Sequence, residues 1–455
     1  MLRRIALSSC LLLAAPAVAE TPATKPPVVY DGVTVIDGTG AAARPGMAII
    51  ARDGRIDSIV PSSQWKARLG TKLAATAQVV DLHGDYALPG LIDSHVHLAT
   101  DPDPVFEQAQ LRRFIYSGVT TVRDMAGDTR VLSFLSRQTM LHKMEGPDIY
   151  YAALMAGTQF FHDPRTVASA QGAMPGDVPW MQAMTDGVDI PLAVARAKGT
   201  GATALKLYAD MTGELDAKIT AEAHRQHMLV WGHAATFPAS PMEVVDAGED
   251  VVSHACMLAY QASATMPPEY HHRAPVDDVK FANGTQLLAP LFADMKAHHT
   301  ILDATIYVYK AMWDETGSKS PPPYCKTELA ERITKAAHAA GIDVSTGTDA
   351  DTDWDKPLPS VFDEIALLVN DAGFTPMEAI RAATLVGAKT VGQEKNLGSL
   401  EAGKRANILF VAKDPLADIQ NLRTVVLTVK DPEEFWRNKY PPITKDEAKS
   451  VIAGR

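Results

Sequence analysis

Residues 88–98 of this 455-residue chain read LPGLIDSHVHL, and this stretch decides the fold. Alternate residues of a strand share a face, so Asp93, His95 and His97 point to the same side, and two imidazoles two positions apart can bind one metal ion. A hydrophobic run precedes them and the loop ATDPDP follows directly, which puts them at the carboxyl end of a strand. TIM barrels build their active sites at that end. The stretch predicts a barrel strand that ends in a metal site.

Four other segments have the same form, a short apolar strand ending in one metal-binding or ionisable side chain. They are ATALKLY (202–208) with Lys206, MLVWGHA (228–234) with His233, DVVSHA (250–255) with His254, and IDVSTGTDA (342–350) with Asp349. His233 follows Lys206 by 27 positions and His254 follows His233 by 21, spacings that suit one strand–helix unit each. Short Val/Ile/Thr-rich segments alternate with helical patterns from 88 to 395, which indicates a parallel sheet.

The two flanks of this α/β region are short, β-rich and similar to each other. VVYDGVTVIDGTG and GMAIIARDGRIDSIV lie before it, with Asp-Gly pairs at 31–32, 37–38 and 53–54 expected to form hairpin-type turns, and LGSLEAGKRANILFVAKDP and TVVLTVKD lie after it. The prediction is an α/β fold in which a TIM (β/α)8 barrel is inserted into a small composite β-sandwich domain. We expect the β domain at 20–87 and 396–432, the barrel at 88–395, and a polar extension at 433–455. TPME at 375–378 predicts a helix that begins with a capping box.

The first 19 residues have the pattern of a secretory signal peptide. Arg3 and Arg4 precede an apolar stretch, and Ala17-Val18-Ala19 forms a cleavage site before Glu20. A lipoprotein site at Cys10 is the alternative, but only three apolar residues would then precede it. No later run of 18 or more apolar residues exists, so we expect a periplasmic or secreted protein with no membrane contact after cleavage.

Composition excludes several classes of protein. The chain is 46% hydrophobic and 21% charged, as a folded globular protein is, and its net charge is −11. Loss of residues 1–19 removes two arginines and no acid, so the mature charge is −13, which disfavours nucleic acid or an anionic membrane as a partner. Cys256 and Cys325 alone remain after cleavage, and we expect them to be free thiols, with Cys256 a small core-filling side chain rather than a soft metal ligand.

The series HxH, Lys, His, His, Asp on successive strand ends resembles the amidohydrolase superfamily, in the prolidase- and imidazolonepropionase-like branch with two metals and a carboxylated lysine. GVTTVRDMAG (118–127) and LGSLEAGKRANILFVAKDPLADI (397–419) also resemble that superfamily, so the likeness covers nearly the whole mature chain. It implies a small-molecule amide substrate and two divalent ions, with Zn the usual occupant. A homo-oligomer is compatible with it.

The resemblance also implies a role for each of these side chains. The first metal would be bound by His95, His97 and Asp349, the second by His233 and His254, and Lys206 would bridge both as a carbamate formed with CO2. The carbamate supplies anionic oxygens that an ammonium lacks. A hydroxide between the metals would attack the substrate, and Asp349 would carry its proton to the leaving amine.

Each assignment has an alternative. Lys206 can instead be a salt-bridge partner, which would leave one metal bound by His95, His97, His233 and Asp349. His233 and His254 can be satisfied core histidines. Asp351 and Asp353 compete with Asp349, which we prefer because it follows its strand directly.

Residues of the βα loops are candidates for substrate binding. Tyr208 shares a face with Lys206 and can donate to the substrate carbonyl, or pack as a barrel tyrosine. The loop GTQFFHDPR (157–165) offers His162 and Arg165, and Arg165 is either a partner for a substrate carboxylate or a solvated arginine. His271 and His272 lie in a long loop that can act as a lid. His298 and His299 precede their strand, and we expect them to be structural.

These features predict an exported metal-dependent amidohydrolase that cleaves an amide in a dipeptide or an N-acyl amino acid. The alternatives are a one-metal deaminase or cyclic-amide hydrolase, a lactone or ester hydrolase of the same fold, and a non-catalytic periplasmic binding protein. The last is disfavoured because every expected ligand position is filled.

Overall fold

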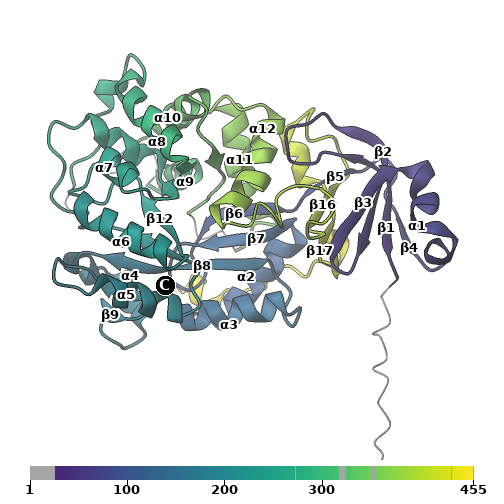
Figure 1. Cartoon of the computed structure of the whole chain (residues 1–455), viewed down its shortest axis with the longest axis horizontal. Coiled ribbons are helices and arrows are strands. Elements are labelled where there is room, and N and C mark those ends of the chain that lie inside the picture. The colour runs from purple at the N-terminus through teal and green to yellow at the C-terminus, as the bar shows by residue number, and fades with distance from the viewer. Residues whose placement is uncertain (1–25, 272, 317–323, 350–353, 432, 454–455) are drawn as a thin grey trace, which may run out of the picture.

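The computed structural model describes residues 26–271, 273–316, 324–349, 354–431 and 433–453. The predicted signal peptide, His272, Asp351 and Asp353 lie outside these ranges. A barrel of alternating strands and helices occupies most of the molecule, and a separate sheet made from both ends of the chain lies at one side of it (Figure 1). No helix within the described ranges has the length and hydropathy needed to cross a membrane.

Parallel strands form a nearly closed barrel, as predicted. Neighbour pairs with neighbour in chain order through β6 (Leu91–Val96), β7 (Val119–Asp124), β8 (Asp148–Ala156), β11 (Ala204–Leu207), β12 (Leu229–His233), β13 (Val251–Ser253), β14 (Ile301–Asp303) and β15 (Val344–Ser345). The first and last strands approach each other where the Ser94 amide donates to the Thr346 carbonyl at 2.7 Å. Two short strands, β9 (Asp177–Val178) and β10 (Met181–Ala183), extend the edge beside β8.

Helices between these strands cover the outside of the barrel (Figure 1). They are α2 (Pro104–Tyr116), α3 (Thr129–Met140), α4 (Pro164–Ala170), α5 (Ile190–Gly199), α6 (Gly213–Arg225), α7 (Pro241–Asp246), α8 (Ala289–His298), α9 (Ile306–Thr316), α10 (Thr327–Ala339), α11 (Val361–Asn370), α12 (Pro376–Arg381) and α13 (Gly387–Thr390). The capping box predicted for the helix at 376 is confirmed, since Thr375 and Glu378 each bond the backbone amide of the other. One large apolar cluster runs between the strands and the helices.

The second body is a mixed sheet built from both flanks, which confirms the composite β domain. Its strands are β1 (Val28–Val35), β2 (Arg44–Arg52), β3 (Arg55–Pro61), β4 (Gln78–Asp81), β5 (Tyr86–Pro89), β16 (Ile408–Val411), β17 (Val425–Lys430) and β18 (Glu433–Trp436). β5 pairs with β16, so the two ends of the chain meet in the middle of the sheet. The helix α1 (Trp65–Ala74) covers it at the N-terminal side (Figure 1).

The structure corrects one expectation about the turns of the flanks. Asp53-Gly54 forms the hairpin turn between β2 and β3, but Asp31-Gly32 lies inside β1, where the pairing with β2 shifts register, and is therefore an irregularity of the strand rather than a turn. The described part of the predicted C-terminal extension, residues 433–453, contains regular elements. It begins with β18, ends with α14 (Lys449–Ile452), and packs Ile443 against α2.

The expectation of free thiols is wrong. Cys256 and Cys325 form a disulfide across 69 positions, with their Cα atoms 6.1 Å apart. Both side chains are buried. The pairing is decided by tertiary structure, because α10 and the segment before it fold back against the residues that follow β13, a proximity that sequence spacing does not reveal.

Candidate metal centre

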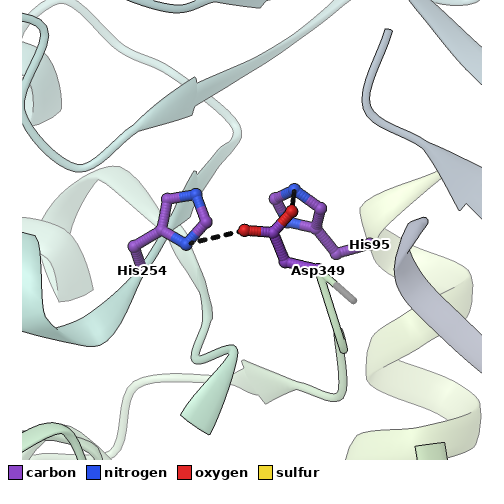
Figure 2. A group of neighbouring side chains, drawn as sticks. All are labelled: His95, His254 and Asp349. Atoms are coloured by element: carbon purple, nitrogen blue, oxygen red, sulfur yellow. Dashed lines mark ion pairs between the residues drawn. The ribbon is translucent and has the colours of Figure 1, made fainter. Parts of the chain in front are cut away.

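Three of the predicted ligands converge at the carboxyl ends of the barrel strands. The ligand atoms of His95, His254 and Asp349 all lie within 4.8 Å of one another (Figure 2). The two oxygens of Asp349 face different imidazoles, with Oδ1 3.2 Å from His95 Nε2 and Oδ2 3.7 Å from His254 Nδ1. A carboxylate between two imidazoles is a donor set that divalent metals bind.

The other predicted ligands adjoin this group. His97 Nε2 is 3.1 Å from Asp349 Oδ1, and the His233 ring centroid is 4.7 Å from that of His254. The buried Lys206 Nζ and His233 Nδ1 have no hydrogen-bond partner among the residues that the structure describes. Buried polar atoms are rarely left without a partner, so a bound group such as a metal ion would complete the environment of these two nitrogens. The arrangement of nitrogen and oxygen donors therefore fits a metal centre.

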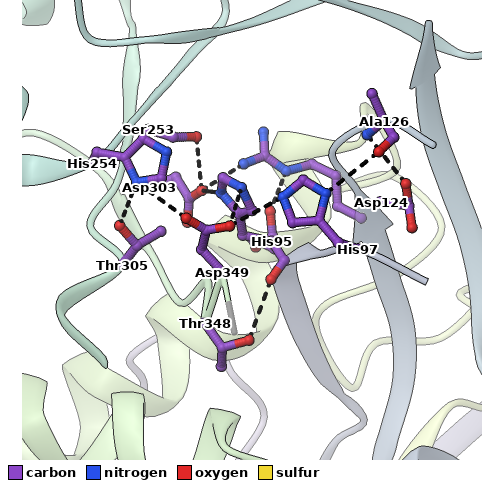
Figure 3. A network of polar contacts seen from close by, with 12 residues as sticks. His95, His97, Asp124, Ala126, Ser253, His254, Asp303, Thr305, Thr348 and Asp349 are labelled. Carbon is purple, nitrogen blue, oxygen red and sulfur yellow. Dashed lines mark hydrogen bonds and ion pairs between the residues drawn. The ribbon is translucent and has the colours of Figure 1, made fainter. Parts of the chain in front are cut away.

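A buried carboxylate that the sequence analysis missed orients His95. Asp303 Oδ2 lies 2.8 Å from His95 Nδ1 and accepts hydrogen bonds from Arg123 Nη2 at 2.8 Å and the Ser253 hydroxyl at 2.9 Å (Figure 3). The hydrogen-bond network assigns the His95 proton to Nδ1, which leaves the lone pair of Nε2 facing Asp349. Arg123 lies in GVTTVRDMAG and Asp303 ends β14, so position at a strand end was the available signal.

Asp93 supports the metal centre rather than joining it. Its carboxylate accepts from the amides of His95 and Thr348 at 3.1 and 3.2 Å and from the Thr348 hydroxyl at 3.0 Å. The Asp349 amide donates to the His95 carbonyl at 3.0 Å. Asp93 thus joins the end of β6 to the loop that carries Asp349.

The backbone at this end of the barrel is held in an uncommon conformation. His254, Asp349 and Thr305 have positive φ angles of 76°, 46° and 48°. The Thr305 hydroxyl lies 2.9 Å from His254 Nδ1 (Figure 3). Non-glycine residues in this region cost free energy and occur at functional sites where the surrounding structure enforces them. Here the enforced turn directs each side chain inward.

Burial and neighbouring charges shift the proton affinities of these groups. Burial, with the charge of Arg123, lowers the pKa of Lys206 to about 7, and burial lowers the pKa of His254 to about 3. Burial alone would raise the pKa of Asp349, but the adjacent His95 and His97 outweigh it and hold that pKa well below its usual range. A neutral lysine, a neutral imidazole and an ionised carboxylate are the forms that bind cations.

Of the predicted substrate-binding residues, Tyr208 and Arg165 lie near the metal centre and His162 lies at the surface. Tyr208 is buried, and its ring centroid lies 4.0 Å from that of His233 and 4.3 Å from that of Phe160. The guanidinium of Arg165 lies 5.9 Å from the Tyr208 ring centroid, and its Nε and Nη2 donate to Asp163 at 3.0 and 2.7 Å. His162 is exposed, and its Nδ1 lies 3.2 Å from the Gln159 carbonyl.

The loop after β13 contributes a residue that the sequence analysis did not single out. The Tyr270 ring lies 5.5 Å from that of His233 and 5.4 Å from that of Tyr208. The neighbouring His271 stacks on Phe160 at 5.8 Å, so the loop predicted as a lid does contact the residues beside the metal centre. Tyr270 carried no signal because its approach to His233 depends on how this loop folds.

The pair predicted to be structural lies at the end of α8. His298 Nε2 is 3.8 Å from Asp294 Oδ1, and with Asp246 these residues form a group at the helical surface in which Asp294 is half-buried. His299 caps α8 with a φ of 58°. Neither residue belongs to the cluster around His95 and Asp349.

Comparisons with known proteins cover most of the chain. An ochratoxinase from Aspergillus niger is 24% identical over 450 residues, which cover 89% of this chain and 84% of that protein. A 5-methylthioadenosine/S-adenosylhomocysteine deaminase from Symbiobacterium thermophilum is 24% identical over 415 residues, covering 84% of this chain and 85% of the relative. The crystal structure of a putative prolidase from Bifidobacterium longum superposes with a TM-score of 0.68 at 24% identity, over 94% of this chain and 99% of its own, which supports the barrel fold.

The model of the amidohydrolase family matches residues 86–433, a range that contains the barrel and every ligand candidate named above. The chain belongs to the amidohydrolase family, and it is a metal-dependent hydrolase that acts on carbon–nitrogen bonds.

Proposed function

We propose that this protein is an exported amidohydrolase that cleaves the amide bond of a dipeptide or an N-acyl amino acid. The observation that carries the proposal is the convergence of His95, His254 and Asp349 with the unpartnered nitrogens of Lys206 and His233. The names of two relatives, an ochratoxinase and a putative prolidase, are compatible with amide hydrolysis.

We infer that the centre holds two divalent ions, for which Zn²⁺ suits the nitrogen and oxygen donors. His95, His97 and Asp349 would hold one ion, His233 and His254 the other, with Lys206 between them as a carbamate. The buried, unpartnered Lys206 Nζ supports this reading, since carbamylation gives it oxygens that bind cations. Bound ions supply Lewis acidity and lower the pKa of water.

The chain's own groups would bind, orient and transfer protons. Asp349 would take the proton of the attacking water and donate it to the leaving nitrogen, because its carboxylate is ionised and faces the centre. Tyr208 would donate a hydrogen bond to the substrate carbonyl from beside His233. The rings of Phe160 and Tyr270 would limit access of bulk water.

The test is a screen of dipeptides and N-acyl amino acids with protein reconstituted in Zn²⁺, Mn²⁺ or Co²⁺, scored against a Lys206→Ala variant. We expect the unaltered protein to hydrolyse amides and to contain two ions per chain by elemental analysis. The variant should lose both the hydrolysis and the two-ion content. Full metal content with no amide cleaved across the library would contradict the proposal.

A one-metal deaminase is the second candidate, and the similarity to a deaminase over most of the chain favours it. It would need no carbamate on Lys206. Ammonia release from amino-heterocycles by protein with one ion per chain, undiminished in Lys206→Ala, would select this function over amide hydrolysis.

Export is part of the proposal. The disulfide between Cys256 and Cys325 supports it, because such bonds persist in oxidising compartments. Expression of the full chain in a Gram-negative host, followed by fractionation and N-terminal sequencing, should give a periplasmic protein that begins at Glu20. A cytoplasmic protein that retains residues 1–19 would contradict export.

A further inference from the structure

A buried arginine with no acidic partner among the described residues lies one aromatic ring away from the metal centre. Arg273 is only 9% exposed, and no ion pair joins it to a carboxylate anywhere in the described part of the chain. Its Nη1 donates to the Tyr270 carbonyl at 2.7 Å and the Tyr260 hydroxyl is a further hydrogen-bond neighbour, but its buried Nε has no partner among the described residues. A buried cation with an unused donor is costly unless an anion completes it.

Aromatic rings hold the guanidinium in a defined place. The Tyr324 ring centroid lies 3.6 Å from Arg273 Cζ and that of Tyr270 lies 4.0 Å away. Tyr324 precedes Cys325, which forms the disulfide with Cys256. Cys256 lies two positions after the ligand candidate His254, so the disulfide attaches the segment of Tyr324 close to the metal centre. Cation–π contacts partly offset the burial of the charge, but the buried Nε keeps no hydrogen-bond partner among the described residues.

The position of Arg273 suits a group attached to the scissile bond. The Tyr270 ring adjoins both the guanidinium and His233, at 4.0 and 5.5 Å. In an N-acyl amino acid the carboxylate carbon lies within about 4 Å of the scissile carbonyl carbon, since only three bonds separate them. A cation one ring away from the centre is placed to reach it.

Arg165 is the less suitable of the two arginines. Its Nε and Nη2 donate to the two carboxylate oxygens of Asp163, and its side chain is 55% exposed. A substrate carboxylate at Arg165 would compete with Asp163 in contact with water, whereas no carboxylate of the described residues is paired with Arg273.

We propose that Arg273 binds the free carboxylate of the substrate, so that the enzyme selects amides with an anionic amino-acid half over their neutral counterparts. The inference rests on the proposed amide hydrolysis and narrows its substrate class. It departs from the expectation that Arg165 has this role.

The experiment measures binding and turnover separately. Calorimetry with Zn²⁺-loaded protein uses two probes, N-acetyl-leucine and N-acetyl-leucinamide, which differ only in the carboxylate. We expect the unaltered protein to prefer the acid, Arg273→Met to lose that preference on the order of 100-fold, and the matched control Arg165→Met to retain it. Arg273→Lys keeps the charge without the planar fork and should give an intermediate preference, and it serves if Arg273→Met fails to fold.

Turnover of the same pair by the unaltered protein distinguishes the two proposals. Acid-selective binding that Arg273→Met abolishes supports the inference even where neither probe is hydrolysed, an outcome that would count against amide hydrolysis alone. Equal binding of acid and amide, or a preference lost in Arg165→Met and kept in Arg273→Met at full metal content, would overturn it.

Discussion

Asp303 holds His95 across 208 positions of sequence, with its Oδ2 2.8 Å from His95 Nδ1. The same oxygen receives Arg123 Nη2 at 2.8 Å and the Ser253 hydroxyl at 2.9 Å, all of them buried. One carboxylate thus fixes the ring that faces Asp349 while remaining paired with a cation.

Substitution of this carboxylate should weaken metal binding. In Asp303→Asn the amide no longer favours the Nδ1–H form of His95, so we expect metal affinity to fall about 10- to 100-fold, measured by competition with a chromogenic chelator. Ser253→Ala removes one hydrogen bond from the same oxygen and keeps its charge, and it should bind metal almost normally. Equal affinities in both variants would contradict the role given to Asp303.

Metal removal should lower thermal stability. The donors around Asp349 come from separate strands and meet only in the folded state, so a metal at 1,000 times its Kd adds about 4 kcal/mol. A chelator should lower Tm by several degrees, and added Zn²⁺ should restore it. The control is chelator already saturated with Zn²⁺, which should leave Tm unchanged. An identical Tm with and without free chelator would exclude a tightly bound ion.

Loss of the disulfide should destabilise the fold and loosen the wall of the substrate site. Cys256 and Cys325 close a loop of 69 positions. Chain entropy predicts that the double alanine variant loses about 4 kcal/mol of unfolding free energy, measured by urea unfolding. KM should also rise, because Tyr324 loses its anchor beside Arg273. Reductant should affect the unaltered protein but not the double variant. A reductant effect of equal size in both would assign the change to something other than this bond.

Asp216 should make the stability depend on pH. Burial raises its pKa from 3.8 to about 7, although the Thr236 hydroxyl donates to it at 2.6 Å. Between about pH 4 and 7 the folded state therefore binds more protons than the unfolded state, and the stability present at low pH is lost as pH rises.

In Asp216→Asn this loss should disappear. The unfolding free energy of the variant minus that of the unaltered protein should therefore rise by a few kcal/mol between about pH 4 and 7, on the order of 1.4 kcal/mol per pKa unit. Asp355→Asn, at an exposed position, is the control. Parallel curves for Asp216→Asn and the unaltered protein would show that Asp216 does not titrate there.

Lys430 joins the β domain to the barrel. Its Nζ is buried and lies 3.0 Å from Asp148 Oδ1, and it donates to the carbonyls of Thr139 and Gly146 at 2.9 and 3.0 Å. Lys430→Met would leave these groups buried and less well paired, and we expect a loss of about 3 kcal/mol in chemical unfolding. Lys413→Met, on the surface, should change stability by less than about 0.5 kcal/mol. Similar values for both variants would contradict a structural role for Lys430.

Local pattern accounts for much of what could be predicted. The strands that carry His95, Lys206 and His233 lie where the sequence predicted them, because an apolar run followed by one ionisable residue is a feature of contiguous sequence. The strand before Asp349 is shorter than predicted, since β15 ends at Ser345. The capping box at Thr375 is equally local, since both of its hydrogen bonds form within four residues.

Tertiary structure alone decided the remaining features. The pairing of Cys256 with Cys325, the contact of Asp303 with His95, and the enclosure of Arg273 by Tyr270 and Tyr324 each join segments that no periodicity relates. Side-chain periodicity specifies which face of an element is buried, but which distant face it meets depends on the packing of the whole barrel. By itself the sequence determined the barrel and the candidate metal ligands, and only the folded structure decided which groups orient His95 and which buried cation lies next to Tyr270.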